Sequence, residues 1–230
     1  MVRLARLLRR SGSRNWLRLG QFARTKPLSP DFGWDRGQPI DRYYIERFLA
    51  ANASDIRGRV LEIGDDSYSR QFGGAAVERQ EILHVNGQNP KATVVGDLSQ
   101  PDVLPEGGLD CIILTQTLHL IYDMKAAVEQ IRRSLRPGGV ALVTVPGITP
   151  IDRNEWRGSW YWSLTADSAR RLFAEAFGED AVSVTAFGNV FAATAFLHGA
   201  AVEEIDRTKL DLYDEAFPVI VAVRVKAGHG

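Results

Sequence analysis

The sequence predicts an α/β fold in which helices cover both faces of a mostly parallel β-sheet. Short apolar runs alternate with stretches of helical periodicity along most of the 230 residues. One run, LDCIILT, is apolar almost throughout, as in a parallel strand buried on both faces. The composition, 45% hydrophobic and 24% charged, is that of an ordinary globular protein. Such sheets bind ligands at the carboxyl ends of their strands, so we expect the site residues directly after the strands.

The chain divides into residues 1–39, a basic arm with a Pro/Gly-rich connector, and residues 40–230, the predicted domain. Eight basic residues precede the first acidic residue, Asp31, so that 20 basic residues face 28 acidic ones in the rest of the chain. In the first ten residues the leucines share one side of a helix and the arginines the other, which is typical of a helix on an anionic membrane surface. A tail packed on the acidic domain and an organellar transit segment are the alternatives.

Several classes of protein are disfavoured. No apolar run approaches the roughly 18 residues that span a bilayer, and no apolar core of a secretory signal follows the arginines. The single cysteine, Cys111, lies in an apolar run and is expected in the core. No metal-ligand spacing or phosphate loop is present, and the acidic domain disfavours nucleic acid as a partner. We therefore expect a cytoplasmic protein without a metal; the alternative is a cytoplasmic protein with peripheral membrane contact through the arm.

The predicted elements of the first half follow apolar periodicity. Asp41 is expected to cap a helix with apolar residues at helical spacing. Only NGQNPKA separates the second strand from the third, which leaves no room for a helix between them. The predicted elements are this helix, strand Arg59–Ile63, a helical turn Tyr68–Phe72, and strands Glu81–Val85 and Ala92–Gly96.

The second half has clearer start and stop signals. Asp123 and Thr165 each precede an amphipathic stretch and are expected to cap helices. The sequence RPGG is expected to stop the first of these helices and Gly178 the second. The predicted strands are Leu109–Thr115, Val140–Val145, Val182–Ala186 and Val219–Val225, with an extra helix from Val190 to about Ala201.

Several of these motifs together resemble a known family. VLEIG, GDL, LDCIILTQTLHLI and LRPGG before VALVTVPG occur in the order and spacing of the class I S-adenosylmethionine-dependent methyltransferases, in the branch called type 11. The resemblance covers about Asp41 to Gly178, and DRGQPIDRYYIERFL resembles a bacterial subgroup associated with glycan or natural-product assembly. It implies a Rossmann-like methyltransferase fold with seven strands, the last antiparallel. It also implies S-adenosylmethionine as cofactor and methyl transfer, at oxygen, to a small molecule or glycan.

The resemblance implies cofactor-binding residues after the first and third strands. Glu62 would steady the loop or hold the cofactor's amino group, and Gly64 would let the backbone approach the methionine part because it has no Cβ. Asp97 would accept a hydrogen bond from the adenine amino group, while the backbone amide of Leu98 donates to the ring. The alternative is that Glu62 and Asp97 only cap neighbouring backbone amides.

Two departures from the family pattern bear on the cofactor. Asp65 and Asp66 stand where the family has glycines, although a carboxylate such as Asp65 can accept from an ammonium group. Asn86 stands near the end of the second strand, where the family has an acid that accepts both ribose hydroxyls. These departures favour the alternative of a non-catalytic, methyltransferase-like binding protein.

The remaining implied cofactor residues lie before and after these loops. Arg42 is expected to pair with the cofactor carboxylate, or else to form a surface salt bridge. Thr115 and Gln116 follow the fourth strand and are expected to line the methionine arm. His119 comes next and is the candidate base that takes the substrate proton, because an ordinary imidazole pKa of about 6.5 suits that role. The alternative for His119 is a structural role.

An aromatic cluster follows the fifth strand. Trp160, Tyr161 and Trp162 are expected to bind substrate, as a wall for a planar or sugar ring. The alternative is a small aromatic core under a long loop. A third hypothesis, a dinucleotide-dependent oxidoreductase, requires GxGxxG after the first strand and an acid after the second, and the sequence has neither.

Overall fold

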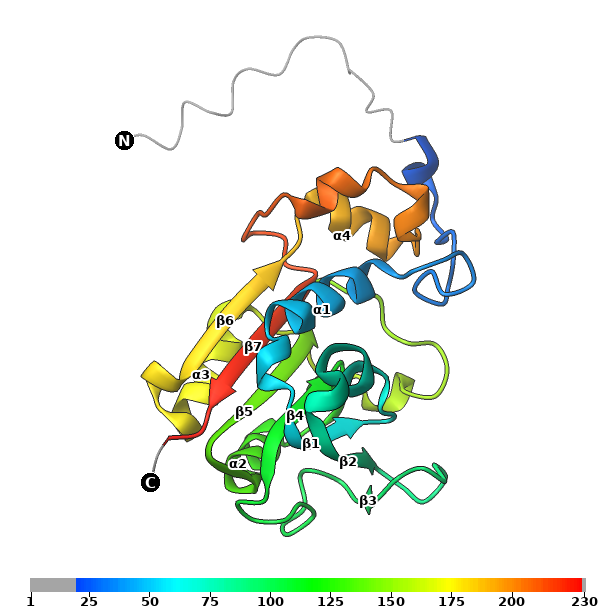
Figure 1. Ribbon diagram of the computed structural model, residues 1–230. Coiled ribbons are helices and arrows are strands. Elements are labelled where there is room, and N and C mark those ends of the chain that lie inside the picture. Colours follow the sequence, from blue (N-terminus) through cyan, green and yellow to red (C-terminus); the bar gives the residue numbers. More distant parts are fainter. Residues whose placement is uncertain (1–19, 229–230) are drawn as a thin grey trace, which may run out of the picture.

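The computed structural model describes residues 20–228, which form one seven-stranded sheet between helices (Figure 1). The strand order is β3-β2-β1-β4-β5-β7-β6, and only β7 runs antiparallel to its neighbours. The prediction of a mostly parallel sheet whose last strand is antiparallel is confirmed. The strands are β1 (Gly58–Ile63), β2 (Val77–His84), β3 (Val94–Val95), β4 (Leu109–Thr115), β5 (Leu135–Pro146), β6 (Val182–Phe187) and β7 (Ile220–Lys226).

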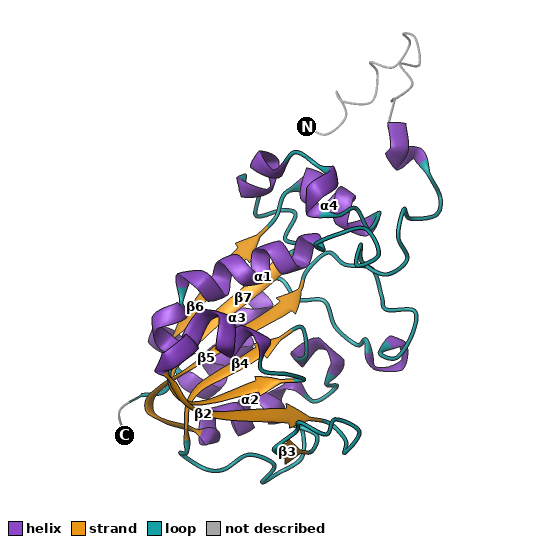
Figure 2. Ribbon diagram, turned by 45° about the vertical axis from the view of Figure 1, so that its right-hand side comes forward, coloured by secondary structure: helices purple, strands orange, loops and turns teal. Residues whose placement is uncertain are grey.

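Helices cover both faces of the sheet (Figure 2). Ile113 of β4 belongs to a core cluster with α1 and α4, whereas the preceding residue, Ile112, belongs to a second cluster with α2 and α3. Successive strand residues point to opposite faces, so the apolar run of β4 supplies both cores. Cys111 of β4 is fully buried, which confirms its core assignment. The helices are α1 (Ile40–Ala51), α2 (Met124–Ser134), α3 (Ala166–Phe177) and α4 (Val190–Leu197).

The predicted caps of α2 and α3 are confirmed. The Asp123 carboxylate accepts the amide of Ala126 at 3.0 Å, and the Thr165 hydroxyl accepts the amide of Ser168 at 3.2 Å. Each bond satisfies a backbone donor that the first turn of a helix leaves unpaired. Gly178 ends α3 with φ of +88°, a conformation that favours glycine.

The predicted cap of α1 is wrong by two residues. Pro39 occupies the cap position, because its φ of −60° and ψ of 145° lead the chain directly into a helix that begins at Ile40. Asp41 therefore lies in the first turn, where its Oδ1 accepts the amide of Arg42 at 2.8 Å. The displacement places a nearly buried carboxylate, 8% exposed, beside the ligand cavity described below.

Strand boundaries differ from the predicted ones by one residue in β1, β6 and β7 and by more in β2, β3 and β5. β2 begins at Val77, which pairs with β1 at Gly58, and ends one residue early, at His84. β3 has only two residues, and the loop between β2 and β3 contains no helix, as predicted. RPGG belongs to β5 itself, because backbone bonds join Gly138 and Gly139 to Ala227 at the end of β7. The extra helix, α4, ends four residues before the predicted Ala201.

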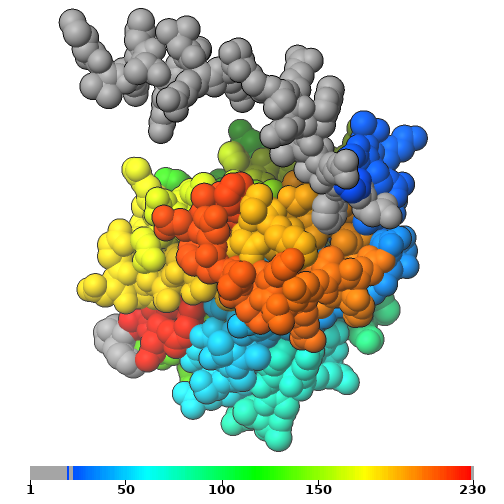
Figure 3. All heavy atoms as spheres, turned by 90° about the horizontal axis from the view of Figure 1, so that it is seen from above, coloured from blue at the N-terminus to red at the C-terminus, as the bar shows by residue number. Residues whose placement is uncertain are grey.

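The connector packs on the α4 side of the domain (Figure 3). The amides of Leu28 and Ser29 donate to the carbonyl of His198 at 2.7 and 3.2 Å, and Pro39 forms a β-bridge with Ala201. Most of the predicted basic arm, residues 1–19, lies outside the described residues. Within residues 20–228, no helix is both long and apolar enough to cross a bilayer.

Candidate active site

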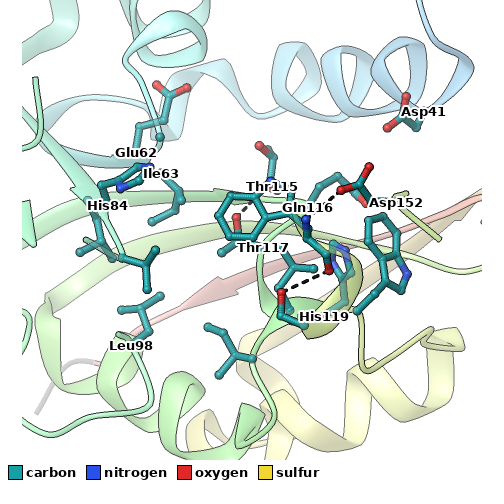
Figure 4. Close-up of a pocket in the computed structure, with 18 of the residues that line it drawn as sticks. Asp41, Glu62, Ile63, His84, Leu98, Thr115, Gln116, Thr117, His119 and Asp152 are labelled. Atoms are coloured by element: carbon teal, nitrogen blue, oxygen red, sulfur yellow. Dashed lines mark hydrogen bonds between the residues drawn. The ribbon is translucent and has the colours of Figure 1, made fainter. Parts of the chain in front are cut away.

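A cavity of about 1120 Å³ opens where β1 to β5 end, at the edge of the sheet where ligands were expected (Figure 4). The loops after β1, β3, β4 and β5 line it together with α1 and the connector. Figure 4 shows Glu62, His84 and Leu98 on one side and Asp41, Asp152 and His119 on the other, with Thr115 to Thr117 between them. We call the first side, with β1 to β3, the β1–β3 half, and the second the β5 half.

The structure brings most of the predicted site residues to this cavity. Asn86 and Trp162 lie outside its lining. The predicted residues that line it are Arg42, Glu62, Gly64, Asp65, Asp97, Leu98, Thr115, Gln116, His119, Trp160 and Tyr161.

Glu62 ties down the loop that follows β1. Its side chain is 2% exposed, and its two carboxylate oxygens accept the backbone amides of Tyr68 and Ser69 at 3.0 and 2.8 Å. Burial raises the pKa of this carboxyl above its ordinary value, although the amides of Ser69 and Tyr68 act in the opposite direction. Glu62 therefore caps neighbouring amides, and through them it fixes the shape of the loop.

Gly64 is the turn residue of that loop. Its φ is +82°, a conformation that side chains with a Cβ rarely adopt, and a Cβ placed there would meet no atom within 4 Å. Gly64 lines the cavity, so the space beside its Cα is room in which a ligand can approach the backbone.

The two aspartates that replace the family's glycines are engaged within the loop. Asp65 lines the cavity, and its Oδ1 accepts the amide of Ser67 at 2.8 Å in a short local turn. Asp66 forms an ion pair with Arg70 at 2.5 Å. The departure from glycine is thus compatible with an ordered loop, because each carboxylate finds a local partner.

At the end of β2 the cavity is lined by His84 rather than by Asn86. Asn86 is exposed and accepts the amide of Gln88 at 3.0 Å through its side chain. The His84 Nδ1 lies 3.0 Å from the carbonyl oxygen of Asn86, which leaves Nε2 as the ring atom for a ligand. The predicted end of β2, Val85, is one residue too late. The Asn86 side chain accepts a hydrogen bond within the following turn and therefore does not reach the cavity.

The loop after β3 contributes Asp97 and Leu98. Asp97 is exposed, and its Oδ1 accepts the amide of Ser99 at 2.9 Å, as expected for a residue that caps the turn. No hydrogen bond from a described residue reaches its Oδ2. Leu98 is 4% exposed and gives this half of the cavity an apolar surface.

The loop after β4 is strained at Gln116. This residue has φ of +47°, which is uncommon for a residue with a Cβ and is often found at functional sites. Its amide donates to the carbonyl of Thr144 at 2.9 Å, and its Nε2 lies 3.3 Å from the Thr144 hydroxyl. These bonds to β5 hold the strained turn, and with it the neighbouring Thr115, against the middle of the cavity.

Arg42 is the only arginine or lysine among the described residues that line the cavity. Its Nη1 donates to the Tyr68 hydroxyl at 3.4 Å, and its guanidinium lies 5.6 Å from the centre of the Trp34 ring. It forms no ion pair within 4.0 Å in the described part of the chain, and its buried Nε has no hydrogen-bond partner there. The predicted alternative of a surface salt bridge is therefore not what the structure shows.

His119 is almost completely buried, at 1% exposure, in a short turn after β4. Among residues 20–228, neither ring nitrogen has a hydrogen-bond partner. Burial lowers the pKa of His119 to about 3, so its ring is neutral in the ligand-free protein at physiological pH. A neutral imidazole has one donor and one acceptor, and a buried ring with both unsatisfied is suited to a polar ligand.

An aromatic wall stands beside His119. Trp160 meets the imidazole edge on, with ring centres 4.4 Å apart, and stacks on Phe32 of the connector at 5.8 Å. At the rim, Tyr161 packs against Tyr122 at 5.3 Å. Trp162 stands behind this rim and donates its Nε1 to the carbonyl of Ile121 at 3.1 Å, so it supports the wall without lining the cavity.

Two carboxylates of the β5 half, Asp41 and Asp152, were not among the residues predicted for the site. Both are 8% exposed and line the cavity. Burial raises the pKa of Asp41, with Arg42 acting in the opposite direction. Asp41 was assigned to a cap, and Asp152 lies in a long loop without a motif, so no local signal pointed to either.

This arrangement can hold an extended ligand across the strand ends. The β1–β3 half offers carboxylates, an imidazole nitrogen and an open backbone at Gly64. The β5 half offers a neutral histidine, aromatic rings and two nearly buried carboxylates. One half suits a polar cofactor and the other a second molecule that reacts with it.

Comparisons with known proteins agree with the fold. A family model described as a methyltransferase domain matches residues 38–179, more than half of the chain. No curated protein matches the sequence. A SAM-dependent methyltransferase from Archaeoglobus fulgidus is 11% identical, with 80% of this chain and 94% of that chain covered and a TM-score of 0.53. One from Mesorhizobium loti is 14% identical, with coverages of 81% and 97% and a TM-score of 0.51.

The same fold also occurs in a protein with another described activity. The [4+2]-cyclase SpnF is 14% identical, with 85% of this chain and 84% of that chain covered and a TM-score of 0.54. At such identities the structural likeness shows the fold alone. The reaction has to be argued from the family and from the site.

Proposed function

This chain belongs to the methyltransferase-domain family, and on that premise we propose that it methylates a hydroxyl oxygen of a small molecule or glycan. The methyl donor of class I methyltransferases is S-adenosylmethionine, which supplies an electrophilic methyl group on a positively charged sulfur. The observation that carries the proposal is His119, which is buried, neutral and without a hydrogen-bond partner beside an aromatic wall.

The β1–β3 half fits S-adenosylmethionine. Gly64 leaves open the space that a Cβ would fill, so its backbone can lie beside the methionine part. Arg42 has an unpartnered Nε and can pair with the donor's carboxylate. Asp97 has a second oxygen with which to accept the adenine amino group.

The other predicted residues complete this assignment. Leu98 would pack against the adenine, and Thr115 and Gln116 would line the methionine arm. Asp65 would accept from the donor's ammonium group with its second oxygen. His84, rather than Asn86, would reach the ribose hydroxyls through Nε2, because His84 is the residue of this loop that lines the cavity.

In the proposed reaction the residues of this chain accept a proton and position the acceptor. His119 would accept the hydroxyl proton as the acceptor oxygen attacks the methyl carbon, and its burial keeps the ring lone pair free of water. The pKa of about 3 in the ligand-free protein is well below the 6.5 expected from the sequence, so this role requires a bound acceptor and donor that raise the pKa of the ring. Trp160 and Tyr161 would exclude water and position the acceptor, since they form the wall and rim next to His119. Aromatic side chains of this kind also suit the faces of a sugar ring, which supports a glycan acceptor.

A second candidate function is binding without catalysis. Asp65 and Asp66 in place of the family's glycines, and the missing acid after β2, favour it. Both candidates predict binding of S-adenosylmethionine or its product, but only the first predicts turnover.

The test is release of S-adenosylhomocysteine when the protein is incubated with S-adenosylmethionine and a panel of hydroxyl-bearing sugars and phenols. We expect turnover with at least one acceptor, and loss of that turnover in His119→Asn. Cofactor binding without turnover on any member of the panel would favour the non-catalytic candidate.

A further inference from the structure

Two carboxylates in the β5 half of the cavity are nearly buried. Asp41 comes from the first turn of α1 and Asp152 from the loop after β5, and each is 8% exposed. Figure 4 shows them on the same side as His119 and opposite Glu62 and His84. The topology thus brings two acids from distant parts of the chain to the half where the acceptor would lie.

Neither carboxylate forms an ion pair in the described protein, although the charge of Arg42 acts on Asp41 and lowers its pKa against the effect of burial. Asp41 accepts one amide from Arg42 and Asp152 accepts one from Trp156, both at 2.8 Å. No lysine or arginine of the described residues forms an ion pair with either. By contrast, the buried Glu81 pairs with Arg59 at 2.9 Å. A buried charge without a counterion is costly, so these two acids are suited to a cation supplied by a ligand.

A second observation points to a ligand at the same place. The two nitrogens of His119 and the Nε1 of Trp160 are buried and have no partner among residues 20–228. Trp156, Trp160 and Tyr161 also line this half, and aromatic faces attract cations. The half therefore combines negative charge, aromatic surface and unused hydrogen-bonding groups.

We propose that Asp41 and Asp152 bind a protonated amino group of the acceptor, so that the acceptor is an amine-bearing molecule such as an amino sugar rather than a phosphate or a carboxylate. The inference rests on the proposed function, because it names the substrate class of the same site. The donor's own positive charge does not account for both acids. The proposed donor contacts Asp65 and Asp97 lie on the other half, after β1 and β3.

The test compares three probes of one shape and different charge: benzylamine, benzyl alcohol and benzoate. Each is titrated by calorimetry and by ligand-observed NMR, with and without saturating S-adenosylhomocysteine. We expect benzylamine to bind at least about 10-fold more tightly than benzyl alcohol, and benzoate most weakly, because the site is anionic.

Matched variants assign any preference to the two acids. In Asp41→Asn and Asp152→Asn the amide oxygen still accepts the backbone bond, so the fold is expected to survive, and neutralising a buried charge should leave the melting temperature unchanged or higher. Each should weaken the binding of benzylamine about 10-fold and leave the binding of benzyl alcohol unchanged. Asp180→Asn, at an exposed position outside the cavity, should change neither.

The inference is overturned if benzyl alcohol or benzoate binds as tightly as benzylamine, if benzylamine shows no binding at about 10 mM, or if both variants keep its preference. Its failure is separable from that of the proposed function. S-adenosylhomocysteine binding without any preference for the amine would remove the cation site and leave methyl transfer standing. A preference for the amine without any binding of S-adenosylhomocysteine would support the cation site and contradict methyl transfer.

Discussion

The imidazole of His119 meets the ring of Trp160 edge on, with centres 4.4 Å apart and planes inclined by 65°. Trp160 in turn stacks almost parallel on Phe32, at 14° and 5.8 Å. These contacts join the loop after β4, the loop after β5 and the connector at one point of the cavity. Among residues 20–228 the imidazole ring is thus held by packing and makes no hydrogen bond, which leaves both of its nitrogens for a ligand.

The first prediction concerns catalysis by His119. His119→Asn should lower turnover by about 100-fold or more and leave cofactor affinity nearly unchanged, because the ring lies in the acceptor half. The matched change His84→Asn should instead lower the affinity for the cofactor and leave turnover at saturating cofactor unchanged. Steady-state kinetics and calorimetry separate these effects, and unaltered turnover in His119→Asn would assign His119 a structural role.

The second prediction concerns stability and pH. Because the folded-state pKa of His119, about 3, lies below its ordinary value of 6.5, the unfolded chain takes up a proton first as pH falls. The stability that His119 contributes is complete above pH 6.5 and is lost between pH 6.5 and 3, by at most about 1.4 kcal/mol per pH unit. Urea unfolding at pH 7.5 and 5 should show wild type losing about 2 kcal/mol more than His119→Asn. Equal losses would contradict the burial of a neutral ring.

The third prediction concerns Glu62 and its loop. Glu62→Gln keeps one acceptor oxygen but turns an NH₂ group toward a backbone amide, so the bonds to Tyr68 and Ser69 cannot both survive. We expect S-adenosylmethionine affinity to fall about 10-fold through loosening of the loop. Glu46 also contributes a carboxylate to the cavity lining, but it accepts a hydrogen bond from Gln38 and not from the loop after β1. Glu46→Gln should therefore lower S-adenosylmethionine affinity less than Glu62→Gln.

The fourth prediction uses two glycines that both have a positive φ. Gly64 and Gly74 have φ of +82° and +52°, and a Cβ on either would meet nothing within 4 Å. Alanine at each should cost about 1–3 kcal/mol of stability, because residues with a Cβ rarely adopt a positive φ. Only Gly64 lines the cavity, so only Gly64→Ala should also weaken S-adenosylmethionine. An equal loss of binding in Gly74→Ala would show that the effect is not local.

The fifth prediction concerns the basic arm, most of which lies outside the described residues. If the arm is a membrane anchor, the full chain should co-sediment with anionic liposomes and a chain truncated before Pro27 should not. High salt should weaken the binding in part, because each basic residue contributes roughly 1 kcal/mol of electrostatic attraction. Equal co-sedimentation of the truncated chain would remove the anchor hypothesis.

Much of the fold was predictable because its signals are local. The apolar run of β4 and the caps Asp123 and Thr165 depend on neighbouring residues, and the structure confirms them. The cap of α1 failed because Pro39, and not the nearby acid, sets the backbone that enters the helix. Local signals therefore fix the elements better than their ends.

The candidate site was predictable only where a motif or a strand end marks it. Glu62, Gly64 and Asp97 follow strands and reach the cavity as expected. Asp41 and Asp152 reach it because the topology brings α1 and the loop after β5 together. The spacing of the two residues in the sequence does not predict this proximity. The β5 half therefore had to be read from the structure.

The most direct test of the central claim is calorimetric titration of the unmutated protein with S-adenosylmethionine and with S-adenosylhomocysteine. We expect both to bind, about 10- to 100-fold more weakly than to a family member that has the ribose-binding acid after β2. A lost charged hydrogen bond costs about 1.5–3 kcal/mol. Asp97→Ala should weaken both further without unfolding the protein. No detectable binding of either ligand at about 1 mM would contradict the claim that this cavity is a working methyl-donor site.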